Sequence, residues 1–202
     1  MEGAIASYSE KILQIARNHN GIVTSKEVTD AKILRAHIQV LVKKGLIEHV
    51  GRGVYILPTQ FSDEMFNLQY RYKRGIFSHE TALFIHDLTD RTPLKFSMTF
   101  PLGYNTTNFK GENVTTFRVK TERYPIGIVS AKSPNGNSIQ VYNPERTLCD
   151  ILHRRYNTDI HVLTDAFKRY TRKKQKDIPL LSEYASVFHV EKKVQAYLDV
   201  LL

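Results

Sequence analysis

Basic and amide side chains recur at helical spacing between residues 32 and 43. Lys32, Arg35, Gln39 and Lys43 fall at i, i+3, i+7 and i+11, so a helix would carry all four on one face. Arginine can form two hydrogen bonds with guanine and glutamine two with adenine, whereas lysine suits phosphates. These residue types at this spacing favour the reading of double-stranded DNA. Considered alone, such a stripe is more often the solvated side of an ordinary amphipathic helix.

A short helix followed by a longer one would position that face. Thr24 and Glu27 have the spacing of a capping box, in which two side chains satisfy backbone amides at a helix start. Asp30 offers a fresh N-cap, so a second helix is expected at residues 31–44, ended by Gly45. This arrangement predicts a helix-turn-helix. The apolar stripe of the second helix is Leu34, Ile38, Leu41 and Val42.

Two short apolar strands are expected next. Leu46 to Val50 and Val54 to Leu57 flank Gly51-Arg52-Gly53, a pattern typical of a hairpin with a small basic tip. Ile22-Val23 could pair with this hairpin as a third strand. The whole predicts a winged helix, whose tip arginine would enter a minor groove or contact a phosphate. The predicted DNA-binding residues are Lys26, Lys32, Arg35, Gln39, Lys43 and Arg52.

The net charge of +9 suggests a polyanionic partner. Residues 1–60 hold 8 Lys and Arg against 5 Asp and Glu, and residues 61–202 hold 21 against 15, so the basic excess extends beyond the DNA-binding segment. Much of this excess lies in a basic run at residues 168–176. A basic run usually marks a solvated helix end, but this one could also contact DNA backbone or an acidic or RNA-bearing partner. The possible second basic patch is Lys168, Arg169, Arg172, Lys173, Lys174 and Lys176.

Composition narrows the class of protein. The hydrophobic fraction of 42% is enough for a globular core. No apolar run approaches the roughly 18 residues that span a bilayer, and the first residues lack the regions of a signal peptide. One cysteine, Cys149, excludes an internal disulfide and fits a reducing compartment. We therefore expect a cytoplasmic protein with no membrane partner.

A domain boundary is expected near Pro58, between a winged helix-turn-helix domain of residues 1–60 and a larger α+β domain of residues 61–202. In the first domain, Ser7 and Glu10 predict a capped helix that runs to Asn18. In the larger domain, helices are expected before and after a small antiparallel sheet. The expected strands are Lys95–Pro101, Asn113–Lys120, Ile126–Lys132 and Ser138–Tyr142, and the expected helices lie at residues 63–74, 78–87, 146–155, 159–170, 180–188 and 191–202.

Candidate catalytic groups are sparse. His79 and His86 are seven residues apart, whereas a zinc-protease helix needs two histidines four apart. Glu145-Arg146 indicates a buried or half-buried ion pair. Glu191-x-Lys193 superficially matches a nuclease, but it falls in a helical pattern. With no glycine-rich phosphate loop, nucleophile elbow or Cys/His zinc set, we expect no catalytic residues, no metal, no cofactor and no enzymatic activity.

Four stretches, in order along nearly the whole chain, resemble blocks of the abortive-infection E (AbiEi-like) antitoxin family: Val50–Tyr55, Gly75–Leu83, Thr99–Tyr104 and Val141–Asp150. The resemblance implies an antitoxin that also represses its own two-gene operon, by binding inverted repeats in the promoter through the N-terminal winged helix. It further implies that the C-terminal domain opposes a nucleotidyltransferase-like toxin, with a direct complex left open. It supplies no compact motif for the residues that counteract the toxin.

Two other functions stay open from the sequence. The chain could be a nuclease or other DNA-processing enzyme that a winged helix directs to DNA, or a scaffold whose winged helix binds protein. If it is a repressor, one head would contact too few phosphates for tight binding at physiological salt. We therefore expect cooperative self-association of two copies on paired repeats.

Overall fold

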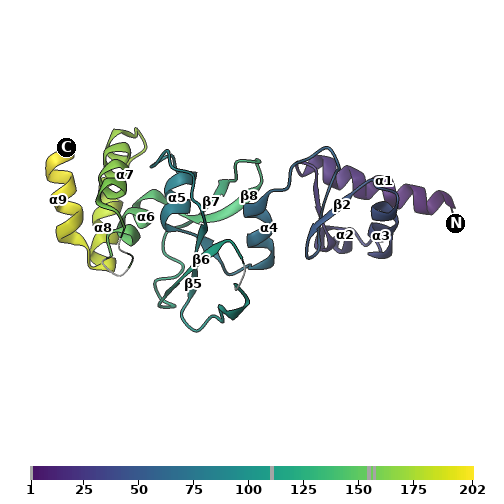
Figure 1. Ribbon diagram of the computed structural model, residues 1–202, viewed down its shortest axis with the longest axis horizontal. Coiled ribbons are helices and arrows are strands. Elements are labelled where there is room, and N and C mark those ends of the chain that lie inside the picture. The colour runs from purple at the N-terminus through teal and green to yellow at the C-terminus, as the bar shows by residue number, and fades with distance from the viewer. Residues whose placement is uncertain (1, 110–111, 154–155, 157) are drawn as a thin grey trace. The chain divides into compact units, whose positions relative to one another are not determined.

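The computed structural model describes residues 2–109, 112–153, 156 and 158–202. The chain divides into two compact units, an N-terminal unit of Met1–Lys73 with Lys132–Ser138, and a larger unit of Arg74–Ala131 with Ile139–Leu202 (Figure 1). The expected division of the chain after residue 60 stays a prediction, and the compact N-terminal unit takes in more of the chain than residues 1–60. In the described residues, no helix has the length and apolar character needed to cross a membrane.

The N-terminal unit combines helices with a three-stranded antiparallel sheet of order β1-β3-β2. Its elements are α1 (Glu2–Asn18), β1 (Ile22–Thr24), α2 (Ser25–Asp30), α3 (Ala36–Lys43), β2 (Glu48–Gly51), β3 (Val54–Ile56) and α4 (Glu64–Arg71). In β3, Val54 lies opposite Thr24 of β1 and Gly51 of β2. This pairing confirms both the expected hairpin and the third strand at Ile22-Val23.

The core of this unit lies among α1, α2, α3 and the sheet. Its buried side chains are Ile12, Ala16, Val23, Val28, Ile33, Ile38, Leu41, Ile47 and Tyr55. Ile12 and Ala16 are four residues apart and therefore share one face of α1. The prediction that this helix begins with a capping box at Ser7 is wrong, because Ser7 lies inside a helix that starts at Glu2. The unpaired amides that an N-cap satisfies belong to the first turn of a helix, and Ser7 lies beyond that turn.

α4 covers the three-stranded sheet. Phe66 and Tyr70 of α4 pack against Ile22, Val54 and Ile56, which come from β1 and β3. The spacing of four residues puts both rings on one face of the helix. α4 therefore packs within the N-terminal unit, although a helix at residues 63–74 was expected in the larger domain.

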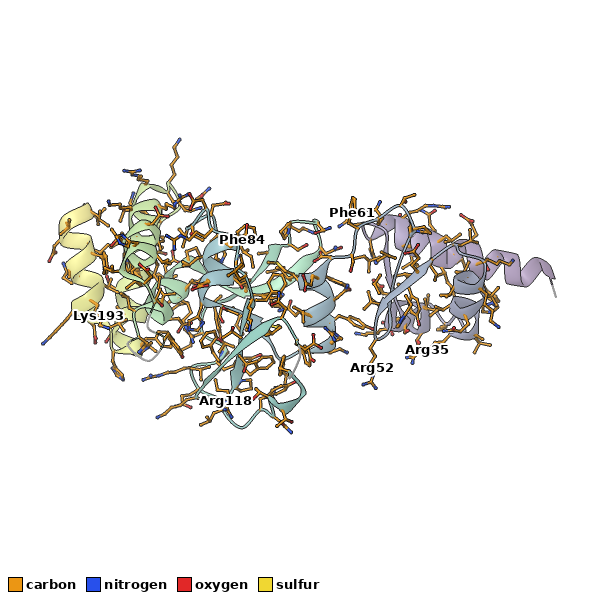
Figure 2. The ribbon with its side chains drawn as sticks, viewed as in Figure 1. Arg35, Arg52, Phe61, Phe84, Arg118 and Lys193 are labelled. Carbon is orange, nitrogen blue, oxygen red and sulfur yellow. The ribbon has the colours of Figure 1, made fainter. Side chains whose placement is uncertain are left out.

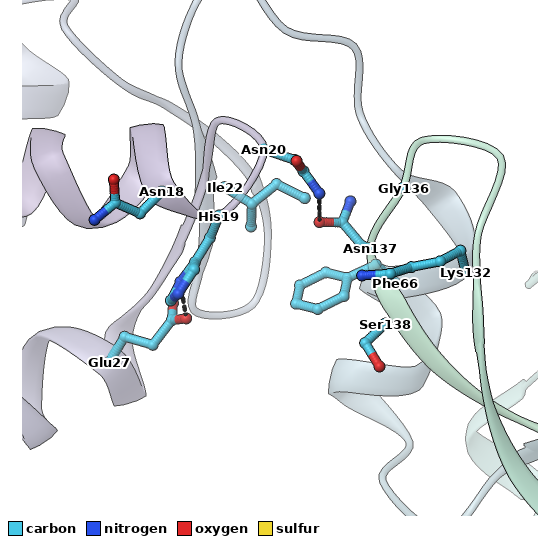
Figure 3. A pocket seen from close by; sticks show the side chains of 10 residues that line it. All are labelled: Asn18, His19, Asn20, Ile22, Glu27, Phe66, Lys132, Gly136, Asn137 and Ser138. Atoms are coloured by element: carbon cyan, nitrogen blue, oxygen red, sulfur yellow. Dashed lines mark hydrogen bonds and ion pairs between the residues drawn. The ribbon is translucent and has the colours of Figure 1, made fainter.

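Asp63 fastens the start of α4 to the turn at residues 132–138. The side chain is 1% exposed, and its Oδ1 accepts a hydrogen bond from the Phe66 amide at 3.0 Å, which caps the helix. Its Oδ2 accepts a hydrogen bond from the Ser133 hydroxyl and another, at 2.7 Å, from the side-chain amide of Asn137. Asn20 also donates to Asn137 at 3.3 Å (Figure 3). Asn20, which precedes β1, and Asp63, which follows β3, thus both hold this turn.

The larger unit contains a five-stranded mixed sheet of order β6-β5-β4-β8-β7. Its strands are β4 (Ile76–Phe77), β5 (Phe96–Pro101), β6 (Val114–Val119), β7 (Ile128–Lys132) and β8 (Ser138–Tyr142). All four expected strands form, but the expected antiparallel sheet is wrong. β4 pairs antiparallel with β5 and parallel with β8, and β5 pairs parallel with β6. The chain between parallel strands must cross back, and local side-chain alternation does not reveal such a crossover.

Helices complete the larger unit, and Figure 1 shows α6 to α9 following one another toward the carboxyl terminus. They are α5 (His79–Ile85), the 3-10 helix η1 (Thr107–Phe109), α6 (Pro144–Ile151), α7 (Ile160–Arg172), α8 (Ile178–Phe188) and α9 (Glu191–Leu201). α6 packs against α5, α7 and α8. It begins at Pro144 rather than at residue 146, because the Asn143 side chain caps it and proline suits the first helical position.

Glu145 and Arg146 are both buried, as expected, but their expected ion pair with each other is wrong. Adjacent helical residues point in different directions, so each side chain has another partner. The Arg146 Nε lies 3.0 Å from each carboxylate oxygen of Asp150, one helical turn later. Glu145 accepts a hydrogen bond from the Tyr170 hydroxyl at 2.8 Å. Burial and this hydrogen bond raise the pKa of Tyr170, so the phenol keeps the proton that it donates.

Candidate nucleic-acid interface

α2 begins with the capping box that its sequence predicts. The Thr24 hydroxyl accepts a hydrogen bond from the Glu27 amide at 3.2 Å, and Glu27 Oε2 accepts one from the Thr24 amide at 2.7 Å. Glu27 Oε1 lies 2.6 Å from Nδ1 of His19 (Figure 3). α2 is therefore fixed to the loop before β1, and Lys26 is exposed on it.

The turn after α2 differs from the sequence expectation. The helix expected at residues 31–44 starts only at Ala36. Lys32 has a φ of 58°, in the left-handed region that ends helices, so α2 is closed before α3 begins. Ile33 then turns inward and is 5% exposed, whereas Leu34, expected in the core, is 74% exposed. The predicted helix start and the predicted burial of Leu34 are both wrong.

α3 keeps a buried and an exposed face. Ile38 and Leu41 are at most 1% exposed. Gln39 and Lys43 are exposed and lie four residues apart, so they share the opposite face. Two of the four residues of the predicted stripe therefore belong to this helix. Lys32 lies in the preceding turn, where it is exposed.

Arg35 is the N-cap residue of α3, and α2 holds its side chain. The Arg35 Nε donates a hydrogen bond to the Thr29 hydroxyl at 2.9 Å, and that hydroxyl donates to the Ser25 carbonyl at 2.8 Å. The side chain is nevertheless exposed. Arg35 thus stands at the N-terminal end of α3, with a defined orientation.

The hairpin of β2 and β3 carries Arg52 at its tip. The strand register shifts between His49 and Gly51, and such irregularities increase the local twist of a hairpin. Gly53 has a φ of 73°, which glycine adopts without strain. Arg52 is exposed, and Figure 2 shows Arg35 and Arg52 projecting from the same edge of the N-terminal unit.

The second basic patch lies in the larger unit. Lys168, Arg169 and Arg172 belong to α7, and the other three residues of the patch follow the end of that helix. Arg169 Nε lies 2.8 Å from Asp165 and a terminal nitrogen lies 3.3 Å from Asp90, so its charge is offset within the chain. Basic residues also suit the negative end of a helix dipole. These features favour the structural interpretation; binding stays a prediction for the exposed residues Lys168, Arg172, Lys174 and Lys176.

Other candidate groups have structural roles. The described residues contain no group of three or more His, Cys, Asp or Glu side chains that could hold a metal ion. Cys149 is 0% exposed, and burial raises the pKa of its thiol, which makes it a poor nucleophile. Lys193, from the nuclease-like pair, donates a hydrogen bond to the Leu152 carbonyl at 2.5 Å and so attaches α9 to the end of α6.

α4 also contributes to this region, which the sequence patterns did not indicate. Arg71 and Lys73, at the end of α4, are exposed, and Tyr70 borders the hairpin tip. One sequence feature marks this segment as basic, since no Asp or Glu occurs between Glu64 and Glu80. Helical periodicity alone could not show that this basic segment packs beside the hairpin.

A protein-family model matches part of the N-terminal unit. Residues 10–58 match the family model described as transcriptional regulator, AbiEi antitoxin, which confirms the expected resemblance for this stretch. The match extends from within α1 to two residues beyond β3. A search of curated proteins found no match to this chain.

One solved structure shares the fold across nearly the whole chain. The chain is similar to the crystal structure of the RV2827C protein from Mycobacterium tuberculosis, with 15% sequence identity and a TM-score of 0.50. The alignment covers 96% of this chain and 81% of that chain. At this identity, the likeness concerns the fold alone.

Proposed function

We propose that this chain is an antitoxin and transcriptional regulator that binds promoter DNA through an N-terminal winged helix. The family match over residues 10–58 supports a regulatory role for that stretch. The order of helices and the three-stranded sheet support the winged-helix assignment. The observation that carries the proposal is the exposure of Arg35, Gln39 and Arg52 around α3 and the hairpin tip, because these side-chain types read DNA bases or grooves.

In this proposal α3 enters the major groove. Recognition helices contact base edges mainly with their N-terminal residues. Arg35 at the N-cap and Gln39 one turn later occupy such positions, and they suit guanine and adenine respectively. The exposed lysines would contact phosphates and set the orientation of the helix. They are Lys26, Lys32 and Lys43.

Arg35→Ala should lower the affinity for operator DNA by about 1–3 kcal/mol, the contribution of one good base contact. The thermal midpoint should stay nearly unchanged, because the hydrogen bond between Arg35 and Thr29 is exposed. Fluorescence anisotropy titrations and thermal melts of both proteins measure the two quantities. Thr29→Val is the matched control, since it removes the anchoring hydroxyl and keeps the guanidinium. A folded Arg35→Ala protein with unaltered operator binding would remove Arg35 from the interface.

Arg52→Ala should reduce the slope of log K against log salt by about 0.9 if Arg52 contacts a phosphate. If Arg52 instead enters a narrow minor groove, operators with A·T-rich flanks should lose more affinity than those with G·C-rich flanks. Titrations at several salt concentrations separate the two modes. Arg17→Ala removes an exposed arginine of α1 that pairs with Glu10 at 2.7 Å, and serves as the control. No change in slope or flank preference for Arg52→Ala would exclude the hairpin from the interface.

Two copies of the chain are proposed to bind inverted repeats in the promoter of its own operon. One N-terminal unit offers few phosphate contacts, so a second copy would be needed for tight binding at physiological salt. Self-association on the DNA would make binding cooperative. Cooperativity should therefore be lost on a probe that carries a single repeat.

The larger unit is proposed to neutralise a nucleotidyltransferase-like toxin, with or without a stable complex. Support comes from the stretches that resemble the antitoxin family. Gly75–Leu83 covers β4 and most of α5, and Val141–Asp150 covers the end of β8 and most of α6. β4 pairs directly with β8 at Phe77 and Val141. α5 and α6 also pack against each other. The resemblance therefore falls on the packed centre of this unit.

A mobility-shift titration tests the DNA-binding proposal. The full chain is titrated onto duplex DNA from the region upstream of its own gene, with and without divalent metal. A shifted but intact band supports a regulator. Cleavage of the probe would indicate a nuclease, and the absence of any shift would indicate a winged helix that binds protein.

A further inference from the structure

The end of α4 carries positive charge outside the family-matched segment. α4 ends at Arg71, and Tyr72 and Lys73 follow it. Arg71 and Lys73 are exposed, and no acidic residue occurs in the sequence between Glu64 and Glu80. The end of α4 is therefore an exposed basic segment.

Tyr70 connects this end of α4 to the hairpin tip. The ring stacks with Phe66, at a centroid separation of 6.2 Å, and packs with the buried residues of β1 and β3. A Cβ atom on Gly53 would lie 3.7 Å from Cε1 of Tyr70, so the ring borders the residue that follows Arg52. The Lys73 ammonium lies 5.7 Å from the centroid of the same ring. One aromatic side chain thus adjoins both the hairpin backbone and Lys73.

We propose that Lys73, with Arg71 beside it, forms a second phosphate-binding point next to Arg52. The inference rests on the proposed binding of DNA by the N-terminal unit. An ammonium is a compact charge on a flexible stem that suits a phosphate. Duplex DNA carries about one negative charge per 1.7 Å of axis, so a cation beside a groove-bound arginine has phosphates within reach. The end of α4 thereby extends the DNA contact beyond residues 10–58.

A purely structural role for Lys73 makes a different prediction. If Lys73 only packs over Tyr70, its replacement would change thermal stability and leave the salt dependence of DNA binding unaltered. A phosphate contact releases counterions, so its loss changes the slope of affinity against salt. The slope therefore separates the two roles, whatever the change in stability.

The test measures binding of the full chain to duplex DNA from upstream of its own gene, for wild type, Lys73→Met and Lys73→Arg. Methionine keeps an unbranched apolar stem over Tyr70 and removes the charge. The slope for Lys73→Met should fall by about 0.9, so its affinity deficit should shrink about 3.5-fold between about 50 and 200 mM salt. Lys73→Arg should restore the wild-type slope.

Lys132→Met is the matched control, because it removes one exposed lysine from the opposite end of α4. Lys132 precedes Ser133, and the Ser133 hydroxyl donates a hydrogen bond to Asp63 at the start of α4. α4 has eight residues, so its start lies about 12 Å from its end, where Lys73 follows. A wild-type slope for Lys132→Met with a reduced slope for Lys73→Met supports the inference. Equal slopes for Lys73→Met and wild type, or equal reductions in both variants, would overturn it while leaving the regulator proposal intact. No DNA binding by wild type would overturn both.

Discussion

Replacing Arg146 by alanine is expected to lower the free energy of unfolding of the larger unit by about 3–5 kcal/mol, the cost of breaking a buried ion pair. Arg146 is 0% exposed, and its Nε lies 3.0 Å from both carboxylate oxygens of Asp150. Its Nη1 donates to the carbonyls of Arg123 and Ile126 at 2.8 and 3.0 Å. Alanine would leave these buried acceptors without the cation that they surround. Urea unfolding followed by circular dichroism measures the loss.

Arg169 provides the control for this result. It also pairs with an aspartate four residues away, Asp165, but its side chain is 37% exposed. An exposed pair contributes at most about 1 kcal/mol, so Arg169→Ala should be nearly neutral. Replacing Arg146 and Asp150 together by Met and Leu should be less damaging than Arg146→Ala, because the Asp150 carboxylate is then not left buried without its cation. Wild-type stability in Arg146→Ala, or equal losses in the two arginine variants, would contradict this account.

A fragment of residues 1–73 is expected to fold, whereas a fragment of residues 1–60 is expected to be marginal at best. The shorter fragment lacks Phe66 and Tyr70, which cover Ile22, Val54 and Ile56 on the three-stranded sheet. Burying one large apolar side chain contributes up to about 1.5–3 kcal/mol, a large share of the stability of so small a domain. Thermal unfolding of both fragments measures the difference. Equal midpoints would show that α4 does not stabilise the sheet.

Cutting the chain after residue 73 should also separate DNA binding from toxin neutralisation. A fragment of residues 74–202 should protect cells that express the toxin, and residues 1–73 should bind a single DNA repeat weakly and without cooperativity. Survival counts and mobility shifts measure the two outcomes for each fragment. Protection by residues 1–73 alone, or none by a folded fragment of residues 74–202, would contradict this assignment.

The helix-turn-helix region shows what periodicity can and cannot predict. Ile38 and Leu41 were expected on the buried face, and they are buried. The start of α3 was misplaced because the pattern of apolar residues fits a longer helix equally well. The turn depends on a left-handed backbone at Lys32, and a lysine gives no sequence signal for that conformation. Arg35 consequently occupies the N-cap of α3, a position that its helical spacing did not indicate.

The larger sheet illustrates a second limit. Its longer strands have clear β-forming sequences and were located to within a few residues. Their pairing depends on contacts between distant segments, such as Phe77 with Val141, and local patterns do not encode them. β4 spans only two residues, too few for an alternating pattern. Burial of the charges at Glu145-Arg146 was expected, but their partners Tyr170 and Asp150 depend on helix geometry and packing.

The burial of Cys149 makes the chain convenient to label. It is the only cysteine and is 0% exposed. Burial raises the pKa of its thiol, so we expect the thiol to react slowly. A cysteine introduced at the surface can therefore take a maleimide fluorophore while the native thiol stays in place. Leu34, 74% exposed between α2 and α3, is a suitable position beside the proposed major-groove helix. A dye there would let single-molecule fluorescence follow the arrival of each copy on an operator.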